Sequence, residues 1–364
     1  MTAPTPQPGI LGIAPYRAGS DTVAGVDRII KLSSNEAALG PSPRAIAAYR
    51  DAAANLHRYP DSDGFALRRA LAARHGIEAE RIVCGNGSDE LISLLTSAYC
   101  GVGDEVLYSR HGFLMYPLAA KACGATPVTA PETDYRADVD ALLSAVTERT
   151  RILFLANPNN PTGTYLPSNE VQRLRENLRD DVLLVIDAAY AELVARNDYS
   201  PGIELVAESD NTVMTRTFSK VYGLAGLRVG WAYCPAGIAE IINRIRGPFN
   251  VNGAAQAAAL AALEDVGHTD MACRHNEVWL PWFAAELAKL GLETVPSVGN
   301  FLLIRFPDEE GRNASAADAF LTKRGILLRD MVAYGLGDCL RATIGTEDEL
   351  RAVVAALAEF MGRT

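Results

Sequence analysis

The chain has 364 residues and a formal net charge of −10 at pH 7, with 49% hydrophobic and 21% charged residues. This length allows one large and one small domain, and the hydrophobic content fits a well-packed globule. An acidic balance without a block of lysine and arginine argues against a nucleic-acid binder. The sequence also lacks the ~18-residue apolar run of a membrane span and a basic-then-apolar secretion signal. We therefore expect a cytoplasmic globular protein with no nucleic-acid or membrane partner.

Six cysteines are scattered through apolar surroundings without any CxxC pair. This pattern favours reduced core residues and gives no indication of a disulfide framework or a metal site.

From about residue 80, short apolar segments typical of strands alternate with amphipathic segments typical of helices. Ser88–Tyr99 and Glu170–Leu178 are two of these predicted helices. Continuous apolar strands separated by helices indicate a mainly parallel sheet covered on both faces. The predicted strands are Arg81–Cys84, Glu105–Tyr108, Thr126–Thr129, Arg151–Ala156, Val182–Ile186, Thr212–Thr215 and Arg228–Tyr233.

The last third of the chain predicts a smaller α+β domain. Its strands are Asn300–Phe306, Ile326–Leu328 and Leu340–Ile344, and a helix over Glu347–Met361 closes it. We expect residues 1–35 to form an N-terminal arm and part of the small domain, residues 36–245 the large domain, and residues 246–364 the small C-terminal domain. Ligand sites in open α/β sheets lie beyond the carboxyl ends of the strands, so the segments after the strands are the candidate site.

The segment Gly85–Glu90 follows the first predicted strand and opens a helix. Its glycines allow close approach of the backbone, Ser88 can cap the helix, and the free N–H groups favour an anion. An ordinary helix N-terminus is the alternative interpretation.

The loop Asn157–Gly163 follows another strongly apolar strand and contains two Asn-Pro pairs. The prolines stiffen the loop, so that it can present an amide side chain in one orientation. A common turn is the alternative.

Asp187 ends the strand Val182–Ile186, and Tyr190 follows three residues later. A carboxylate at the end of a buried strand is costly unless a positive group pairs with it, and a protonated pyridine nitrogen is such a group. Tyr190 could then donate a hydrogen bond to a ring oxygen. An aspartate that caps the next helix is the alternative.

Lys220 lies in a segment that begins with Thr217, contains Ser219 and several glycines, and ends with Arg228. Lysine condenses with an aldehyde, while hydroxyls and arginine hold a phosphate. By itself the lysine would more often be solvated. Together, however, the four segments supply what pyridoxal 5′-phosphate needs: a phosphate cradle, a Schiff-base lysine and an acid for the ring nitrogen.

With these motifs in register, the chain resembles the fold-type I pyridoxal-phosphate aminotransferases, and among them the histidinol-phosphate aminotransferases, over nearly its whole length. The resemblance implies a large domain with a mainly parallel seven-stranded sheet between helices, a smaller α+β domain, and a homodimer. The segments that carry it are Ala14-Pro15-Tyr16, Leu32–Glu36, Arg58–Asp61, Gly87–Glu90, Asn157–Gly163, Asp187 with Tyr190, Lys220–Arg228 and Leu340–Gly345.

The resemblance also implies roles for single residues. Lys220 would bind the cofactor aldehyde and carry a proton between the substrate Cα and the cofactor C4′. Asp187 would pair with the pyridine nitrogen, and Asn160 and Tyr190 with the ring oxygen. The residues implied around the phosphate are Gly87, Ser88, Asp89, Thr217, Ser219 and Arg228, joined by Tyr59 from the partner subunit.

Phe113 takes the position at which many relatives have a tyrosine against the cofactor ring; stacking survives this change, but a hydroxyl is lost. His111, in the same segment, is expected to be solvated and to lie outside the catalytic set. Arg341 resembles the clamp for the substrate α-carboxylate. The other implied substrate-binding residues are Tyr16 and Arg329, toward the far phosphate, with Asn35 and Asn160.

The implied function is transamination between histidinol phosphate and 2-oxoglutarate in histidine biosynthesis, by a ping-pong cycle. Transamination of phenylalanine and tyrosine, alone or in addition, is the nearest alternative, because Arg329 and Arg341 could bind a phosphate or a carboxylate. A decarboxylase of amino-acid phosphates is a further alternative on the same scaffold. A cofactor-binding transcriptional regulator is disfavoured because no helix-turn-helix block or basic patch is present.

Overall fold

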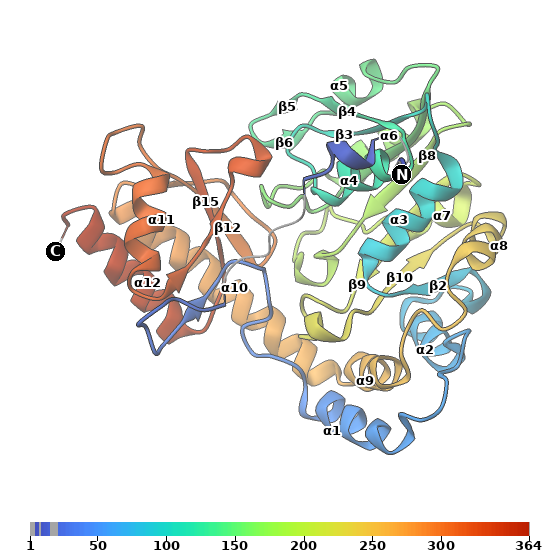
Figure 1. Cartoon of the computed structure of the whole chain (residues 1–364), viewed down its shortest axis with the longest axis horizontal. Coiled ribbons are helices and arrows are strands. Elements are labelled where there is room, and N and C mark those ends of the chain that lie inside the picture. Colours follow the sequence, from blue (N-terminus) through green and yellow to red (C-terminus); the bar gives the residue numbers. More distant parts are fainter. Residues whose placement is uncertain (1–3, 7–8, 15–20, 364) are drawn as a thin grey trace.

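The computed structural model describes residues 4–6, 9–14 and 21–363. Figure 1 shows a large lobe built around a central sheet and a smaller lobe at the C-terminal end of the chain. The long helix α10 (Val266–Lys289) runs between the two lobes. Two lobes of unequal size are the arrangement that the sequence predicted.

The sheet of the large lobe has seven strands in the order β2-β10-β9-β8-β7-β3-β4. The strands from β9 to β4 pair in parallel, and β10 runs antiparallel to both of its neighbours. This confirms the predicted mainly parallel sheet. The strands are β2 (Ile82–Gly85), β3 (Glu105–Ser109), β4 (Thr126–Ala130), β7 (Thr150–Ala156), β8 (Leu183–Asp187), β9 (Thr212–Thr217) and β10 (Gly230–Tyr233).

All seven predicted strands are present, and the one clear difference lies at β10. The prediction began this strand at Arg228, whereas the structure begins it at Gly230. Arg228 has a φ of 54°, in the left-handed region, which cannot continue an extended strand. The arginine therefore belongs to the loop before β10.

Helices cover both faces of the sheet because its strands are apolar on both faces. In β7, Ile152 and Phe154 pack in one core with α3, α4 and α8, while Leu153 and Leu155 pack in the opposite core with α5 and α6. Successive side chains of a strand point to opposite faces, so a continuous apolar run fills two cores. These helices are α3 (Ser88–Tyr99), α4 (Met115–Ala122), α5 (Val139–Ser144), α6 (Ser168–Asn177) and α8 (Ala236–Ile245).

A third core lies beside β2 and β10, where Trp231 packs against Leu67, Leu71 and Ala258. The division at residue 245 stays a prediction, but the packing of α9 in this core favours a boundary inside α10. The helices of this part are α1 (Pro43–Ala52), α2 (Phe65–His75), α7 (Ile203–Glu208) and α9 (Gly253–Glu264).

The small lobe contains a four-stranded antiparallel sheet in the order β11-β12-β15-β14. The segment β1 (Ile30–Lys31) pairs in parallel with β13 (Ile326–Leu327), so the chain enters this lobe before it forms the large one. The other elements are β11 (Glu293–Thr294), β12 (Phe301–Arg305), β14 (Arg329–Asp330), β15 (Cys339–Thr343), α11 (Ala314–Thr322) and α12 (Glu347–Phe360).

Short elements complete the fold. The hairpin of β5 (Glu132–Thr133) and β6 (Arg136–Ala137) turns at Asp134 and Tyr135, which both have positive φ, as tight two-residue hairpin turns require. The 3₁₀ segments are Ile10–Gly12, Ala53–Asn55, Ala79–Arg81, Ala191–Leu193, Ala225–Leu227 and Val332–Tyr334.

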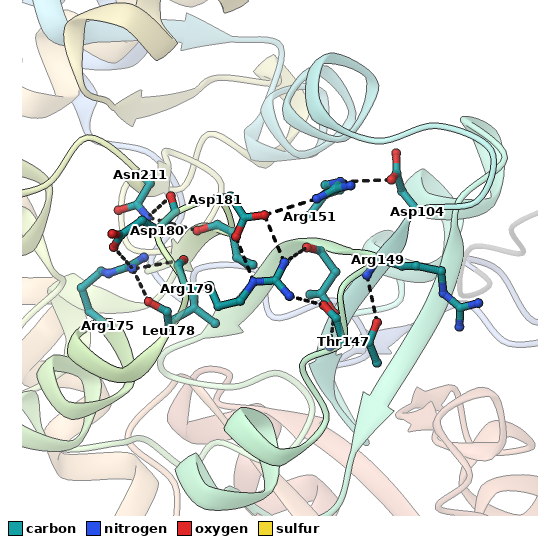
Figure 2. Close-up of polar contacts among 12 residues, drawn as sticks. Asp104, Thr147, Arg149, Arg151, Arg175, Leu178, Arg179, Asp180, Asp181 and Asn211 are labelled. Carbon is teal, nitrogen blue, oxygen red and sulfur yellow. Dashed lines mark hydrogen bonds and ion pairs between the residues drawn. The ribbon is translucent and has the colours of Figure 1, made fainter.

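Ion pairs join the loops at the amino ends of β3, β7 and β8 (Figure 2). Arg151 contacts Asp104 at 3.1 Å and Asp181 at 3.4 Å, and Arg179 contacts Asp181 at 2.9 Å. Exposed pairs of this kind contribute about 0–1 kcal/mol each. Their effect is local: they fasten loops at the edge of the sheet opposite to the carboxyl ends of its strands.

The cysteines are free, and Cys84, Cys234 and Cys339 are buried. Burial raises the pKa of the Cys84 thiol to about 12, so this thiol stays protonated and unreactive. Within the described part of the chain, no group of histidine, cysteine, aspartate and glutamate is placed to hold a metal ion. No described helix is long and apolar enough to cross a membrane.

Candidate active site

A cavity of about 240 Å³ lies at the carboxyl ends of the central strands. A second cavity, of about 390 Å³, adjoins it and shares Ser34, Asp89, Phe113, Asn160 and Lys220 as lining residues. We call them the inner and the outer cavity. The predicted residues that line the inner cavity are Ser88, Asp89, Phe113, Asn160, Asp187, Tyr190, Thr217, Ser219, Lys220 and Arg228. Those that line the outer cavity include Asn35, Arg329 and Arg341.

Lys220 follows β9 and lies between the two cavities. Its Nζ donates to the carbonyl oxygen of Ser34 at 3.3 Å and lies 5.5 Å from the centroid of the Tyr190 ring. Burial, together with the charge of Arg341, lowers the pKa of Lys220 to about 8. A large fraction of this amine is therefore neutral near pH 8 and able to act as a nucleophile or a base.

Asp187 ends β8 at the floor of the inner cavity. Its carboxylate accepts hydrogen bonds from the hydroxyl of Tyr116 at 2.9 Å and from that of Thr215 at 3.3 Å. Burial raises the pKa of Asp187 to about 6. A buried carboxylate of this kind is stabilised by a cationic partner, so it fits the protonated nitrogen of a pyridine ring.

Tyr190 lines the same cavity, and its buried ring packs edge-on against Phe301. Its hydroxyl oxygen accepts a hydrogen bond from the side-chain amide of Asn35 at 2.8 Å. Burial raises the pKa of Tyr190 to about 12. The hydroxyl therefore keeps its proton and can donate it to an oxygen on a bound ring.

The other end of the inner cavity is suited to a phosphate. Arg228 contacts Asp89 at 3.0 Å and the Ser219 hydroxyl at 3.3 Å. The amino end of α3 opens there with Gly87 at the N-cap and no side-chain cap. Gly87 has a φ of 81°, and a Cβ at this position would meet the Arg228 Nη2 at 2.5 Å. Uncapped N–H groups, a guanidinium and hydroxyls together form an anion site.

The prediction that Ser88 caps α3 is wrong. Gly87 occupies the N-cap, and Ser88 is the first helical residue. The glycine is required because this backbone is left-handed and Arg228 approaches it closely. Thr217 acts inside the loop, where its hydroxyl accepts a hydrogen bond from the Ser219 N–H at 3.1 Å.

Arg341 and Arg329 lie opposite each other on neighbouring strands and line the outer cavity. The guanidinium of Arg341 donates to the Asn160 side chain at 2.5 Å and to the Ser33 carbonyl at 2.7 Å. These contacts hold a buried guanidinium in one orientation. An anionic group entering the outer cavity would meet two arginines from the same sheet.

Of the predicted residues that the structure describes, Gly87 and Tyr59 line neither cavity. Tyr59 is 83% exposed and stacks on Phe249 with ring centroids 4.6 Å apart. A side chain so placed lies on the outside of its own subunit. Tyr16 falls outside the described residues.

Sequence reasoning missed several residues of the site. Tyr116, which holds Asp187, is 71 positions away from it, and no local pattern connects the two. Tyr334 lines the outer cavity from a short 3₁₀ segment, and burial raises its pKa to about 12. The expectation that His111 is solvated is wrong, because its ring is nearly buried and contacts Glu132.

Comparisons with known proteins agree with this site. A family model for aminotransferases of class I and II matches residues 27–357. The chain belongs to the class I and II aminotransferase family. Its lysine, buried aspartate and anion site are the features that a transaminase with a pyridoxal cofactor requires.

Among its relatives, the histidinol-phosphate aminotransferase of Paramagnetospirillum magneticum is 63% identical over 362 residues and is covered, like this chain, over its full length. That of Rhodospirillum rubrum is 55% identical, over 98% of this chain and 97% of the relative. The solved histidinol-phosphate aminotransferase of Sinorhizobium meliloti, in complex with pyridoxal-5′-phosphate, has a TM-score of 0.86 and 31% identity, over 92% of this chain and 91% of its own.

Proposed function

We propose that this chain is a pyridoxal-phosphate-dependent aminotransferase that acts on histidinol phosphate and 2-oxoglutarate. The observation that carries the proposal is the presence of Lys220, with its lowered pKa, and Asp187, with its raised pKa, on one cavity that ends in an anion site. The relatives that are 53–63% identical over the whole chain support the choice of substrate.

Bound pyridoxal phosphate supplies an electron sink that stabilises negative charge at the substrate Cα. The residues of this chain hold the group and move protons around it. Arg228, Ser219 and the amino end of α3 would bind the phosphate. Asp187 would keep the ring nitrogen protonated, and Phe113 would pack against the ring.

Lys220 would bind the cofactor aldehyde, and once the substrate amine displaces it, its free amine would carry the proton between the substrate Cα and the cofactor C4′. Its pKa of about 8 suits both steps, because the amine must be neutral to attack and to accept a proton. Asn160 and Tyr190 would donate to the ring oxygen.

The outer cavity binds the rest of the substrate. Arg341 and Arg329 receive anionic groups, which are carboxylates in glutamate and a phosphate in histidinol phosphate. Leu114, Met115 and Leu118 form an apolar part of its wall, against which an imidazole ring can pack. The same wall suits a phenyl ring, so this observation also favours transamination of aromatic amino acids as a second candidate function.

The proposed assembly is a homodimer in the cytoplasm, in which Tyr59 reaches the phosphate site of the partner subunit. Leu56, Tyr59 and Phe65 are 76%, 83% and 60% exposed, and Phe249 stacks on Tyr59. An apolar group of this kind on a monomer surface indicates a contact with another protein. A second copy of the chain would cover it.

Replacing Lys220 tests the proposal. We expect the purified protein to show the absorbance band of bound pyridoxal phosphate, and Lys220→Ala to lose both this band and multiple-turnover transamination. Lys289→Ala is the matched control, because Lys289 is exposed and pairs with Glu286 at the end of α10. Sustained turnover by Lys220→Ala would refute the assignment of the lysine.

A further inference from the structure

A buried pair of His111 and Glu132 lies next to the two cavities without lining either of them. The Nδ1 of His111 is 2.7 Å from one carboxylate oxygen of Glu132, and the backbone N–H of His111 donates to the other at 3.0 Å. The side chains are only 11% and 3% exposed. Because carboxylate oxygens accept hydrogen bonds, Nδ1 carries a hydrogen here. Burying a carboxylate is costly unless it is paired and hydrogen-bonded, and both oxygens of Glu132 have a partner in His111.

The pair is part of a hydrogen-bond network that connects three loops and is closed by a hairpin. The carbonyl of His111 accepts from the side-chain amide of Asn159 at 3.2 Å, and the same amide donates to the Thr162 hydroxyl at 3.0 Å. The hydroxyls of Thr162 and Thr164 are 2.8 Å apart, and Thr164 donates to the carbonyl of Tyr135 at 2.8 Å.

Tyr135 and Glu132 belong to the same hairpin, which closes the hydrogen-bond network. The hairpin is also fixed from its other side, because Tyr135 packs against a small-lobe cluster that contains Val295, Leu303 and Met331. The network therefore joins three loops to the small-lobe cluster, and it adds to the pairing of β3 with β4, which already brings the His111 loop and the hairpin together.

Two loops of the hydrogen-bond network, those of His111 and Asn159, each contribute a residue to the site. Phe113 follows His111 by two positions, and Asn160 follows Asn159 directly; both line the inner and the outer cavity. Gly112, between His111 and Phe113, is held by a hydrogen bond from its N–H to the Ser109 carbonyl at 2.8 Å, and it packs so closely on Tyr108 that a Cβ there would meet this side chain at 2.9 Å. A shift of His111 would therefore move Phe113, and a shift of Asn159 would move Asn160.

We propose that the His111–Glu132 pair positions two residues of the site through the closed hydrogen-bond network. It would set Phe113 against the cofactor ring and Asn160 beside the oxygen of that ring. This inference rests on the proposed function. His111 and Glu132 are positioning residues, since neither contacts the cavities. Loss of the pair loosens both loops at once, so the cofactor ring loses its fixed orientation.

Glu132→Ala tests this, and its main readout is the circular dichroism band of bound pyridoxal phosphate, which depends on the orientation of the ring. We expect a changed band, weaker cofactor binding and a kcat lower by about 10- to 100-fold with a smaller change in KM. Glu132→Gln should restore these properties to within about threefold, because its carbonyl still accepts from the His111 N–H and its amide can donate to Nδ1 once the imidazole hydrogen moves to Nε2.

Glu105→Ala is the matched control. Glu105 is equally buried, at 5% exposure, and pairs with Arg149 at the opposite end of the strand that leads to His111. We expect it to lower the melting temperature by a similar amount but to leave the dichroism band and the cofactor affinity unchanged. If Glu132→Ala behaves like Glu105→Ala in all three measurements, the pair is only structural and the proposal is overturned.

If Glu132→Ala does not fold, His111→Phe carries the test, because it keeps an aromatic ring beside Tyr135 and removes only the side-chain hydrogen bond. An unchanged dichroism band and affinity in His111→Phe would likewise overturn the proposal. Failure of the proposed function is a different result: the unaltered protein would then show no cofactor band at all.

Discussion

Lys220 and Asp187 show how one physical cause prepares two residues for opposite tasks. Burial disfavours the charged form of each, which lowers the pKa of the lysine to about 8 and raises that of the aspartate to about 6. A large fraction of the lysine is thereby neutral near pH 8, while the ionised aspartate is stabilised by a cation bound beside it. Both changes cost folding free energy, which is typical of residues kept for function.

The raised pKa of Asp187 predicts a pH-dependent stability. Because the folded chain binds this proton more tightly than the unfolded chain does, stability should fall as the pH rises from about 4 to about 6, and the loss should persist above it. Without cofactor, Asp187→Asn should be more stable than the unaltered protein at pH 7.5 by up to about 3 kcal/mol, and equal to it near pH 4.

Urea unfolding of the cofactor-free proteins at the two pH values measures this difference. The same substitution should abolish transamination, because a neutral amide does not keep the ring nitrogen protonated. Equal stability of the two proteins at pH 7.5 would show that burial does not raise the pKa of Asp187.

Site residues that belong to a local sequence pattern could be predicted. Site residues that are defined only by contacts between distant segments could not. Lys220, Asp187 and Asn160 each follow a recognisable strand, and the structure places all three on one cavity. The contact of His111 with Glu132 spans 21 positions and depends on a hairpin with no sequence pattern connecting it to the site.

At the scale of elements, the site is made by the loops at the carboxyl ends of β2, β7, β8 and β9. The apolar runs of these strands predicted the sheet, since strands buried on both faces are continuous in hydrophobicity. The direction of β10 could not be predicted in the same way, because an antiparallel strand in the interior of such a sheet has the same apolar pattern as a parallel one.

The turn before α3 gives a prediction at this scale. Gly87→Ala places a methyl group where Arg228 lies 2.5 Å away, so the guanidinium must move off the phosphate site. We expect the dissociation constant for pyridoxal phosphate to rise by at least about tenfold, since a hydrogen bond to a charged group contributes about 1.5–3 kcal/mol. A fluorescence titration with the cofactor measures it.

Gly103→Ala is the control for backbone strain. Gly103 also has a positive φ, of 96°, but no atom lies within 4 Å of a Cβ there. It should lose stability like Gly87→Ala and bind the cofactor normally. Equal affinities in the two variants would argue against a phosphate site at Gly87.

At the scale of the molecule, the site forms where the two lobes meet. The segment after β1 belongs to the small lobe through the pairing of β1 with β13, yet Ser34 contacts Lys220 and Asn35 contacts Tyr190. Asn35 adopts a φ of 56°, a backbone conformation that asparagine tolerates better than most residues. The sequence motif around Asn35 was recognisable, and residues 1–35 were expected to form the N-terminal arm and part of the small domain, a division that stays a prediction.

The exposed apolar group around Tyr59 leads to a prediction about assembly. Leu56→Arg should dissociate the proposed dimer, because a charge would be buried in the contact. Val102→Arg is the control, as Val102 has the same 76% exposure and lies in the turn before β3, away from Tyr59. Sedimentation velocity should find a monomer for the first variant and a dimer for the second. A monomeric unaltered protein would contradict the assembly.

The substrate is the central claim, and one comparison tests it most directly: kcat/KM for histidinol phosphate and for phenylalanine, each with 2-oxoglutarate and the cofactor-loaded protein. We predict a value at least about tenfold higher for histidinol phosphate, with glutamate as the product and no release of carbon dioxide. A preference for phenylalanine would assign the outer cavity to aromatic amino acids. Release of carbon dioxide would contradict transamination itself.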